Sequence, residues 1–216
     1  MIASYDNFVY KTDDPVFEYH INRGLSEPYP RELAIVKRYL SQFPDKNNVC
    51  IDVGGHIGTT SFPYSRLYKS VIAFEPNPKS YDFFVENVKL NQVKNVEVVN
   101  KGVYNKTMKC IVKQHSGANS GCFCIEESEN GIDVVKLDDH YLDHPIDFIK
   151  IDTEGSELYV LEGSVEIIKR YKPLIQVETN ECCQTNFGYS KQNIYDFLYQ
   201  HGYSVYDDDG NNPLFY

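Results

Sequence analysis

The stretch "VCIDVGGHIGTTSF", residues 49–62, constrains the fold more than any other part of the chain. A short apolar segment, 49–53, runs directly into a turn with three glycines, and helical character follows. Glycine permits tight backbone turns and lets a ligand approach the main chain closely. In open parallel sheets, ligands bind at turns of this kind, beyond the carboxyl ends of the strands. The stretch therefore predicts an α/β fold in which the main chain of this turn holds a nucleotide-type ligand.

Apolar strand-like segments alternate with helix-like segments along most of the chain, which is typical of a parallel sheet with crossover helices. The predicted helices cover Pro30–Gln42, His56–Leu67, 78–90, Leu158–Tyr171 and Ser190–His201, and the predicted strands cover 49–53, 71–74, 96–99, 147–152 and 174–179. The alternation stops between 108 and 137. There Asn130-Gly131, flanked by 122–125 and 132–137, predicts an inserted β-hairpin. Residues 203–216 predict two strands around a turn.

The chain has 216 residues, enough for one α/β domain with a substantial core. We find no repeat, low-complexity tract or linker, and we predict a single domain over 1–216 with an N-terminal cap and helix (1–48) before the core (49–216). The formal net charge of −10 and the lack of a dense Lys/Arg run argue against a nucleic-acid partner. We see no signal-peptide layout and no apolar run of the roughly 20 residues that span a membrane. We expect a soluble, cytoplasmic protein, and its oligomeric state stays open.

Two acidic residues define which ligand suits the turn. Glu75 ends the next strand about 20 residues further on, where an acid accepts hydrogen bonds from ribose hydroxyls. The glycines do not have the G-x-G-x-x-G spacing of dinucleotide folds, and Asp52 would lie awkwardly beside a pyrophosphate. Asp52 suits a ligand with an ammonium and a sulfonium, which is S-adenosylmethionine. An NAD-dependent oxidoreductase is the alternative.

Several longer phrases follow one another in a fixed order: "CIDVGGHIGTTS", "VIAFEPNPKSYDFFVENVKLNQVKNVEVVNKGVY", "VVKLDDHYL", "DFIKIDTEGSELYVLEGS" and "KPLIQVE". In these phrases the chain resembles the FkbM family of methyltransferases, from Val49 to Glu178. The resemblance implies a Rossmann-like, seven-stranded class I methyltransferase sheet that uses S-adenosylmethionine and releases S-adenosylhomocysteine. His56 stands where the family often has asparagine. Residues 1–48 match only loosely, so acceptor selection could reside there, for example in "RGLSEPYPRE".

The resemblance also implies the position of the cofactor on this chain. Asp52 and the glycine turn would surround the methionine end, Glu75 would bind the ribose, and the segments after the next two strands would border adenosine. The implied cofactor-binding residues are Asp52, Gly54, Gly55, His56, Gly58, Thr59, Thr60, Glu75, Pro76, Asn77, Asn100, Gly102, Val103 and Asp152.

The acceptors of the family imply transfer of the methyl group to a hydroxyl, here of a sugar in a glycan or glycoconjugate. A hydroxyl is a weak nucleophile, so a general base is expected. Lys150 and Asp152 share one face of a strand, because side chains alternate with period two, and Lys150 could keep Asp152 ionised or act on the acceptor itself. The other candidates for a catalytic role are Glu154, Glu178 and the loop residues His115 and His144. A non-catalytic S-adenosylmethionine-binding module is a further alternative.

A divalent metal is the last alternative that the residues leave open. Asp152, Glu178 and Asn180 resemble the oxygen ligands of metal-dependent catechol-type methyltransferases, and Mg²⁺ accepts such a set. Their spacing is imperfect, and the six cysteines lack the Cys-x-x-Cys pairs of zinc sites. We therefore predict no metal.

Overall fold

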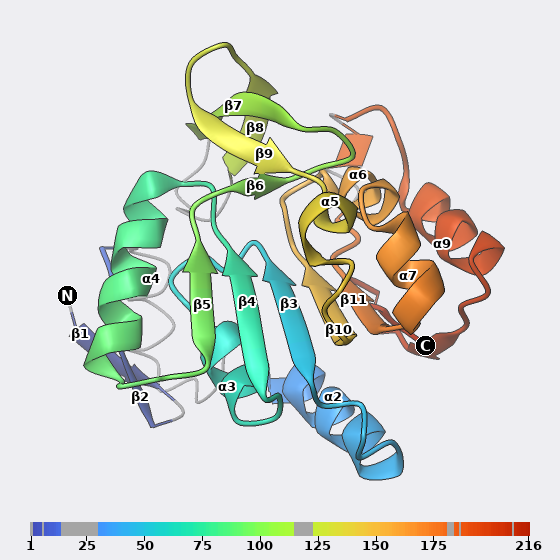
Figure 1. The fold of residues 1–216 in the computed structure, drawn as a ribbon, viewed down its shortest axis with the longest axis horizontal. Helices are drawn as coiled ribbons and strands as arrows, with labels where there is room; N and C mark the ends of the chain where they lie inside the picture. The colour runs from blue at the N-terminus through green and yellow to red at the C-terminus, as the bar shows by residue number, and fades with distance from the viewer. Residues whose placement is uncertain are drawn as a thin grey trace.

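A central sheet of seven strands organises the protein (Figure 1). The computed structural model describes residues 2–5, 7–13, 30–114, 123–180, 184–185, 187–208 and 210–216. The strand order is β12-β13-β11-β10-β3-β4-β5, and β13 runs antiparallel to both of its neighbours, whereas β11, β10, β3, β4 and β5 are parallel. This topology confirms the predicted Rossmann-like class I methyltransferase fold. The strands are β3 (Val49–Val53), β4 (Ser70–Phe74), β5 (Val96–Val99), β10 (Ile146–Ile151), β11 (Leu174–Val177), β12 (Val205–Asp207) and β13 (Leu214–Phe215).

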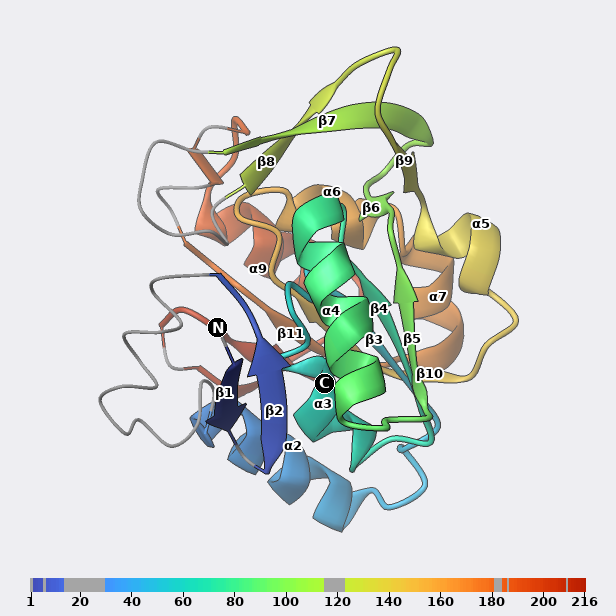
Figure 2. The same ribbon diagram turned by 90° about the vertical axis from the view of Figure 1, so that its left-hand side faces the viewer.

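Helices cover both faces of this sheet (Figures 1 and 2). Because side chains alternate along a strand, Cys50 packs with α2 and α3 on one face, while Ile51 packs with α6, α7 and α9 on the other. The first face carries α2 (Pro30–Gln42), α3 (Ser61–Ser65) and α4 (Pro78–Leu90), and the second carries α5 (Leu137–Tyr141), α6 (Glu157–Glu162), α7 (Val165–Tyr171) and α9 (Lys191–Gln200). No helix in the described part of the chain is long and apolar enough to cross a membrane.

Two of the predicted helices, α2 and α4, have the predicted bounds. Asn77 caps α4, because its Oδ1 accepts the Lys79 N–H at 3.0 Å, and Pro78 occupies the first turn. The last predicted helix is also confirmed: Ser190 and Asn193 form a capping box at the start of α9.

The other two helix predictions were wrong in detail. The helix predicted from His56 begins only at Ser61, since His56 and Gly58 have φ angles of 49° and 98°, which no α-helix accommodates. The helix predicted over 158–171 is divided into α6 and α7 at Gly163. A Cβ at Gly163 would lie 2.1 Å from the Tyr104 carbonyl oxygen, so the chain passes Tyr104 there instead of continuing one helix.

The predicted hairpin at Asn130-Gly131 was also wrong. Its two strands, β8 (Phe123–Glu127) and β9 (Ile132–Val135), do not pair with each other but flank β7 (Met108–Gln114) on opposite sides. A Cβ at Gly131 would lie 2.0 Å from the Cys110 carbonyl oxygen, because the chain crosses the end of β7 closely there. With β6 (Gly102–Val103) these strands form a second sheet of order β6-β9-β7-β8, which lies beyond the carboxyl ends of the central strands (Figure 1).

A two-stranded ribbon near the N-terminus was not predicted. Strands β1 (Ile2–Tyr5) and β2 (Phe8–Lys11) pair antiparallel beside α4 (Figure 2). Asn91 binds the main chain of Val9, with its Oδ1 accepting the N–H at 2.7 Å and its Nδ2 donating to the carbonyl at 2.6 Å. Asn87 binds the main chain of Lys11 in the same way, at 2.6 and 3.1 Å. Two asparagine amides therefore fix the ribbon on α4.

Gly54→Ala should destabilise the protein more than Gly188→Ala. Both glycines have positive φ angles, 87° and 80°, so alanine is strained at either position by about 1–2 kcal/mol. A Cβ at Gly54 would also lie 1.8 Å from the Asp152 carbonyl oxygen, whereas no atom of the described residues lies within 4 Å of a Cβ at Gly188. Urea denaturation of both variants measures the difference. Equal losses in the free energy of unfolding would show that the main chain at Gly54 and Asp152 can move apart to accommodate the added methyl group.

Candidate active site

The carboxyl ends of four central strands bring the predicted acidic residues to one edge of the sheet (Figure 1). Asp52 lies in β3, Glu75 follows β4, Asp152 follows β10 and Glu178 follows β11. Because β3 lies between β4 and β10, Glu75 and Asp152 flank the glycine turn from opposite sides. The strand order thus collects residues that are far apart in the sequence.

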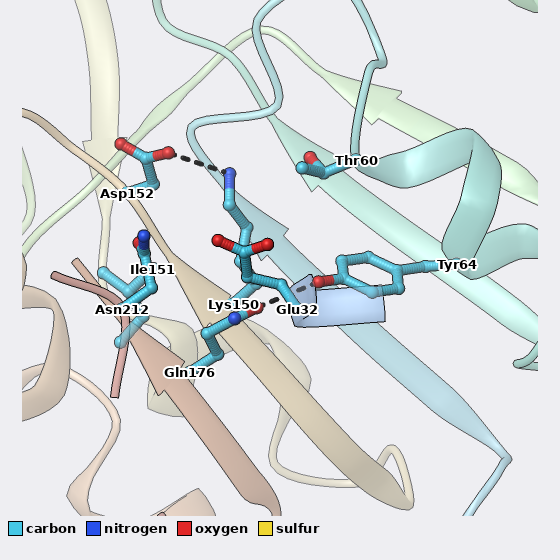
Figure 3. Close-up of a pocket in the computed structure, with 8 residues that line it drawn as sticks. All are labelled: Glu32, Thr60, Tyr64, Lys150, Ile151, Asp152, Gln176 and Asn212. Atoms are coloured by element: carbon cyan, nitrogen blue, oxygen red, sulfur yellow. Dashed lines mark hydrogen bonds and ion pairs between the residues drawn. The ribbon is translucent and has the colours of Figure 1, made fainter. Parts of the chain in front are cut away.

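A buried lysine links two of these acids. Lys150 pairs with Asp52 across the β10–β3 register, and its Nζ lies 3.2 Å from Asp52 Oδ1. This Nζ also lies 3.4 Å from Asp152 Oδ2 (Figure 3). The same Nζ donates to the Gly54 carbonyl at 3.2 Å. Lys150 is only 6% exposed and Asp52 is 0% exposed. Burying either charge alone would be costly, so each charge stabilises the other in the folded protein. We call Lys150, Asp52 and Asp152 the Lys150 cluster.

Two hydroxyls from the start of α3 complete the surroundings of Asp52. Thr60 Oγ1 donates to Asp52 Oδ2 at 2.7 Å and Ser61 Oγ donates to the same oxygen at 2.5 Å. Asp52 Oδ1 makes no hydrogen bond of good geometry, so Lys150 acts on it through charge. Thr60 therefore positions Asp52 rather than capping α3, where it makes no side-chain cap bond.

The glycine turn uses its amides within the protein. Gly54 and Gly55 donate to the Phe74 carbonyl at 3.0 and 2.9 Å, and Gly58 donates to Gly55 at 2.9 Å. A Cβ at Gly55 or at Gly58 would lie 2.7 Å from the ring of Phe84. These two glycines therefore let α4 pack against the turn.

Glu75 is held by the backbone on both sides. Its Oε2 accepts the His56 N–H and its Oε1 accepts the Asn77 N–H, each at 2.8 Å. Asn100 Nδ2 donates to the carbonyl of Glu75 at 2.8 Å and so fixes its main chain. Burial, only partly offset by the two amide bonds, raises the pKa of Glu75 to about 7. The carboxyl therefore changes charge near neutral pH.

Glu178 directly follows β11 and is partly buried. Burial, with the negative charges of Asp152, Glu154 and Glu157 adding to it, raises the pKa of Glu178 to about 9. Its Oε2 is buried and has no hydrogen-bond partner among the described residues. Glu178 thus carries a proton at neutral pH and can donate a hydrogen bond.

Glu157 was not predicted and holds the turn after β10. It is 0% exposed, and its Oε1 accepts the Thr153 N–H at 3.0 Å and the Gly155 N–H at 2.9 Å. Tyr189 OH lies 3.0 Å from its Oε2 and donates to the Gly155 carbonyl. Glu154 lies in this turn with a left-handed φ of 58°. Because an acid at a helix start is usually solvated, nothing in the sequence distinguished Glu157 from a surface residue.

The remaining predicted residues have varied positions. Thr59 is buried beside Thr60, Pro76 precedes the α4 cap, and Gly102 and Val103 are buried in β6. His144 was wrongly considered as a base, because it is exposed and precedes β10, at the opposite end of that strand from Asp152. His115 lies outside the described residues.

Within the described ranges, no group of three or more His, Cys, Asp or Glu side chains is arranged to hold an ion. The alternative set of Asp152, Glu178 and Asn180 contains only two such side chains, so it stays a prediction.

Lys150→Met should destabilise the protein by about 3–5 kcal/mol at pH 8, because Asp52 then has a buried charge without a partner. Urea denaturation at pH 8 measures the loss in the free energy of unfolding, with the exposed Lys69→Met as the control. A loss below about 1 kcal/mol at pH 8 would contradict the role of Lys150.

A family model matches most of the chain, and known methyltransferases are similar to it. The family described as "Methyltransferase FkbM domain" matches residues 52–205. "Methyltransferase 1" of Beauveria bassiana is 28% identical over 165 residues, which cover 62% of this chain and 65% of that protein. The FkbM methyltransferase structure from Methylobacillus flagellatus has a TM-score of 0.54 at 20% identity, and the match covers 79% of this chain and 44% of that chain.

A second solved structure matches over almost its full length. The methyltransferase SMU.1697c of Streptococcus mutans, solved in complex with S-adenosylhomocysteine, has a TM-score of 0.56 at 16% identity, with 86% of this chain and 96% of that chain covered. The chain spans 65% of the fungal relative and 44% of the Methylobacillus chain. Since the family match extends over most of the chain, the protein belongs to the FkbM methyltransferase family.

Proposed function

We propose that the protein is an S-adenosylmethionine-dependent O-methyltransferase that methylates a hydroxyl of a sugar in a glycan or glycoconjugate. One observation carries the proposal: Glu75 and Asp152 follow strands on either side of β3, and the Lys150 cluster connects β3 to Asp152. Two strand spacings separate β4 from β10, about 10 Å. This separation gives room for a cofactor between a ribose-binding acid and a catalytic base.

The described residues fit S-adenosylmethionine. Each Glu75 oxygen accepts one amide and retains a lone pair for a ribose hydroxyl. Asp52 and the carbonyls of the glycine turn would hold the methionine ammonium, together with Gly54, Gly55, His56, Gly58, Thr59 and Thr60. Pro76, Asn77, Asn100, Gly102 and Val103 would border the adenosine. When bound, the cofactor supplies a methyl group already activated on sulfonium.

Asp152 is the residue that we assign as general base. Its side chain is 22% exposed, so an acceptor can reach it, and Lys150 Nζ lies 3.4 Å from its Oδ2. Asp152 would take the proton of the acceptor hydroxyl as the new carbon–oxygen bond forms, a contribution of about 10²–10⁴-fold. Glu178 is protonated at neutral pH and would instead donate a hydrogen bond beside Asp152. Glu154 would line the same turn.

Two alternative functions can be distinguished from the proposed O-methyltransferase. An NAD-dependent oxidoreductase conflicts with the methyltransferase family to which the chain belongs. A non-catalytic binding module would keep cofactor affinity but show no dependence of turnover on Asp152. The family resemblance supports the sugar hydroxyl as acceptor.

S-adenosylhomocysteine should bind more tightly as pH rises from 5.5 to 8. Ribose hydroxyls donate to an ionised Glu75, whose pKa is about 7, so affinity should rise about tenfold per pH unit below 7 and level off above it. Glu75→Gln should bind at least tenfold more weakly at pH 8 and lose this pH dependence, whereas the exposed Glu97→Gln should match the wild type. Calorimetry at four pH values measures the profiles. An unchanged profile in Glu75→Gln would remove Glu75 from the ribose site.

Asp152→Asn should lower turnover by about 10²–10⁴-fold and leave S-adenosylhomocysteine affinity within about twofold. Glu178→Gln is the matched control, because it imitates the protonated acid and should keep most activity at pH 7.5. Formation of S-adenosylhomocysteine with a panel of methyl glycosides gives the rates. Normal turnover of the Asp152 variant would show that another group takes the proton.

A further inference from the structure

Asn87 connects the N-terminal ribbon to the glycine turn. It lies inside α4 and is 0% exposed. Its Nδ2 donates to the carbonyl of Lys11 at 3.1 Å and to the carbonyl of Ile57 at 3.0 Å, while its Oδ1 accepts the Lys11 N–H at 2.6 Å. A buried amide is costly unless its polar atoms find partners, so these bonds hold three segments together. The three segments are β2, α4 and the turn after β3.

Apolar side chains of β2 follow the same path. The ring centroid of Phe62 lies 5.2 Å from that of Phe8 and 5.5 Å from that of Tyr10. Ile57 is buried in the same cluster as these three rings and the ring of Phe84. The ribbon is therefore joined to the turn by apolar packing as well as by the asparagine amide (Figure 2).

Ile57 lies between two residues with left-handed backbone conformations. His56 and Gly58 have φ angles of 49° and 98°. A positive φ is unfavourable for a residue with a Cβ and persists only where the surrounding contacts impose it. The bond from Asn87 to the Ile57 carbonyl is such a contact, one residue after His56. Because the His56 N–H donates to Glu75 Oε2 at 2.8 Å, the position of Ile57 affects where this N–H points.

We infer that Asn87 is a positioning residue for the cofactor site, and that the ribbon acts on Glu75 through it. Along this path β2 orients the Asn87 amide, the amide fixes the Ile57 carbonyl, and Ile57 keeps the His56 N–H on Glu75. The inference rests on the proposed function, because Glu75 is assigned there to the ribose. The family match begins at residue 52, so the ribbon lies outside the matched segment. A turn that is ordered in advance lowers the cost of binding.

The pKa of Glu75 gives a specific readout of this path. Burial raises the pKa of Glu75, whereas the N–H groups of Asn77 and His56 lower it. Two charges also act on this pKa: Lys150 on β10 lowers it, and Asp52 on β3 raises it. Loss of the His56 bond should therefore raise the pKa of Glu75 further. A loss of stability that leaves this bond in place would not change the pKa.

Nuclear magnetic resonance of the free protein tests the inference. Asn87→Leu keeps the size of the side chain and removes its three bonds. In this variant the His56 N–H should exchange with solvent about tenfold faster than in the wild type, the factor expected for one lost hydrogen bond. The pH midpoint of the His56 amide shift, which follows the charge of Glu75, should move upward. Unchanged exchange or an unchanged midpoint would overturn the inference.

Asn91→Leu is the matched control. Asn91 binds the main chain of Val9 as Asn87 binds that of Lys11, but within the described chain it makes no bond to the glycine turn. Its His56 exchange rate should stay within about twofold of the wild type. Equal acceleration in both asparagine variants would assign the effect to general loosening of the ribbon and would also overturn the role of Asn87.

Calorimetry with S-adenosylhomocysteine at pH 8 separates this inference from the proposed function. If the wild type does not bind, the proposed function fails, and the exchange and titration of His56 alone decide about Asn87. If the wild type binds, Asn87→Leu should bind about tenfold more weakly, and Asn91→Leu should stay within about twofold. Equal affinities of the wild type and Asn87→Leu would contradict the inference.

Lys11→Pro decides if circular dichroism shows that Asn87→Leu does not fold. Proline at residue 11 removes the N–H that Asn87 accepts and leaves α4 unchanged. Since one of the three bonds is lost, His56 exchange should be about threefold faster. Val9→Pro is its control, because the Val9 N–H binds Asn91 instead. An exchange rate in Lys11→Pro no faster than in Val9→Pro would overturn the inference.

Discussion

The buried ammonium of Lys150 is the interaction on which the site depends. Charges removed from water are costly unless they are paired, and here one lysine has acids on two neighbouring strands, Asp52 on β3 and Asp152 after β10. The same ammonium donates to Gly54, so the turn after β3 is included in the arrangement. Electrostatics thus hold two strand ends and one turn in a single geometry, at the place where the chemistry is proposed.

A second arrangement of this kind lies on the other side of β3. Glu75 accepts the amides of His56 and Asn77, while Gly54 and Gly55 donate to the carbonyl of Phe74 just before it. The turn and the acid therefore fix each other without any ligand. The backbone amides of Gly54, Gly55, His56 and Asn77 are thus already bonded within the protein.

Much of the fold could be predicted from sequence because the informative signals are local. The apolar period in α2 and the cap at Asn77 depend on neighbours within a few residues, and both helices were predicted with correct bounds. The errors have causes that are distant in sequence: α6 ends at Gly163 because Tyr104 lies against it, and β8 pairs with β7 rather than with β9. Local sequence patterns carry no information about contacts between residues that are far apart in the chain.

The same distinction applies to the site. Asp52, Glu75 and Asp152 were predicted because each follows or ends a recognisable strand. Glu157 and Asn87 were missed, because their burial results from tertiary packing and an acid or amide in the sequence looks solvated by default. The structure adds a packing role for Gly55 and Gly58, because a Cβ at either position would lie 2.7 Å from the ring of Phe84.

The attachment of the N-terminal ribbon has a consequence for how this region can vary in evolution. Asn87 and Asn91 are four residues apart, about 6 Å along a helix, and they meet Val9 and Lys11, two residues apart and about 6.6 Å along a strand. The match involves only main-chain groups of the ribbon, which every residue except proline provides. Side chains at these two ribbon positions can therefore diverge between relatives while the path of the chain is kept, and the two asparagines are the residues that selection should retain.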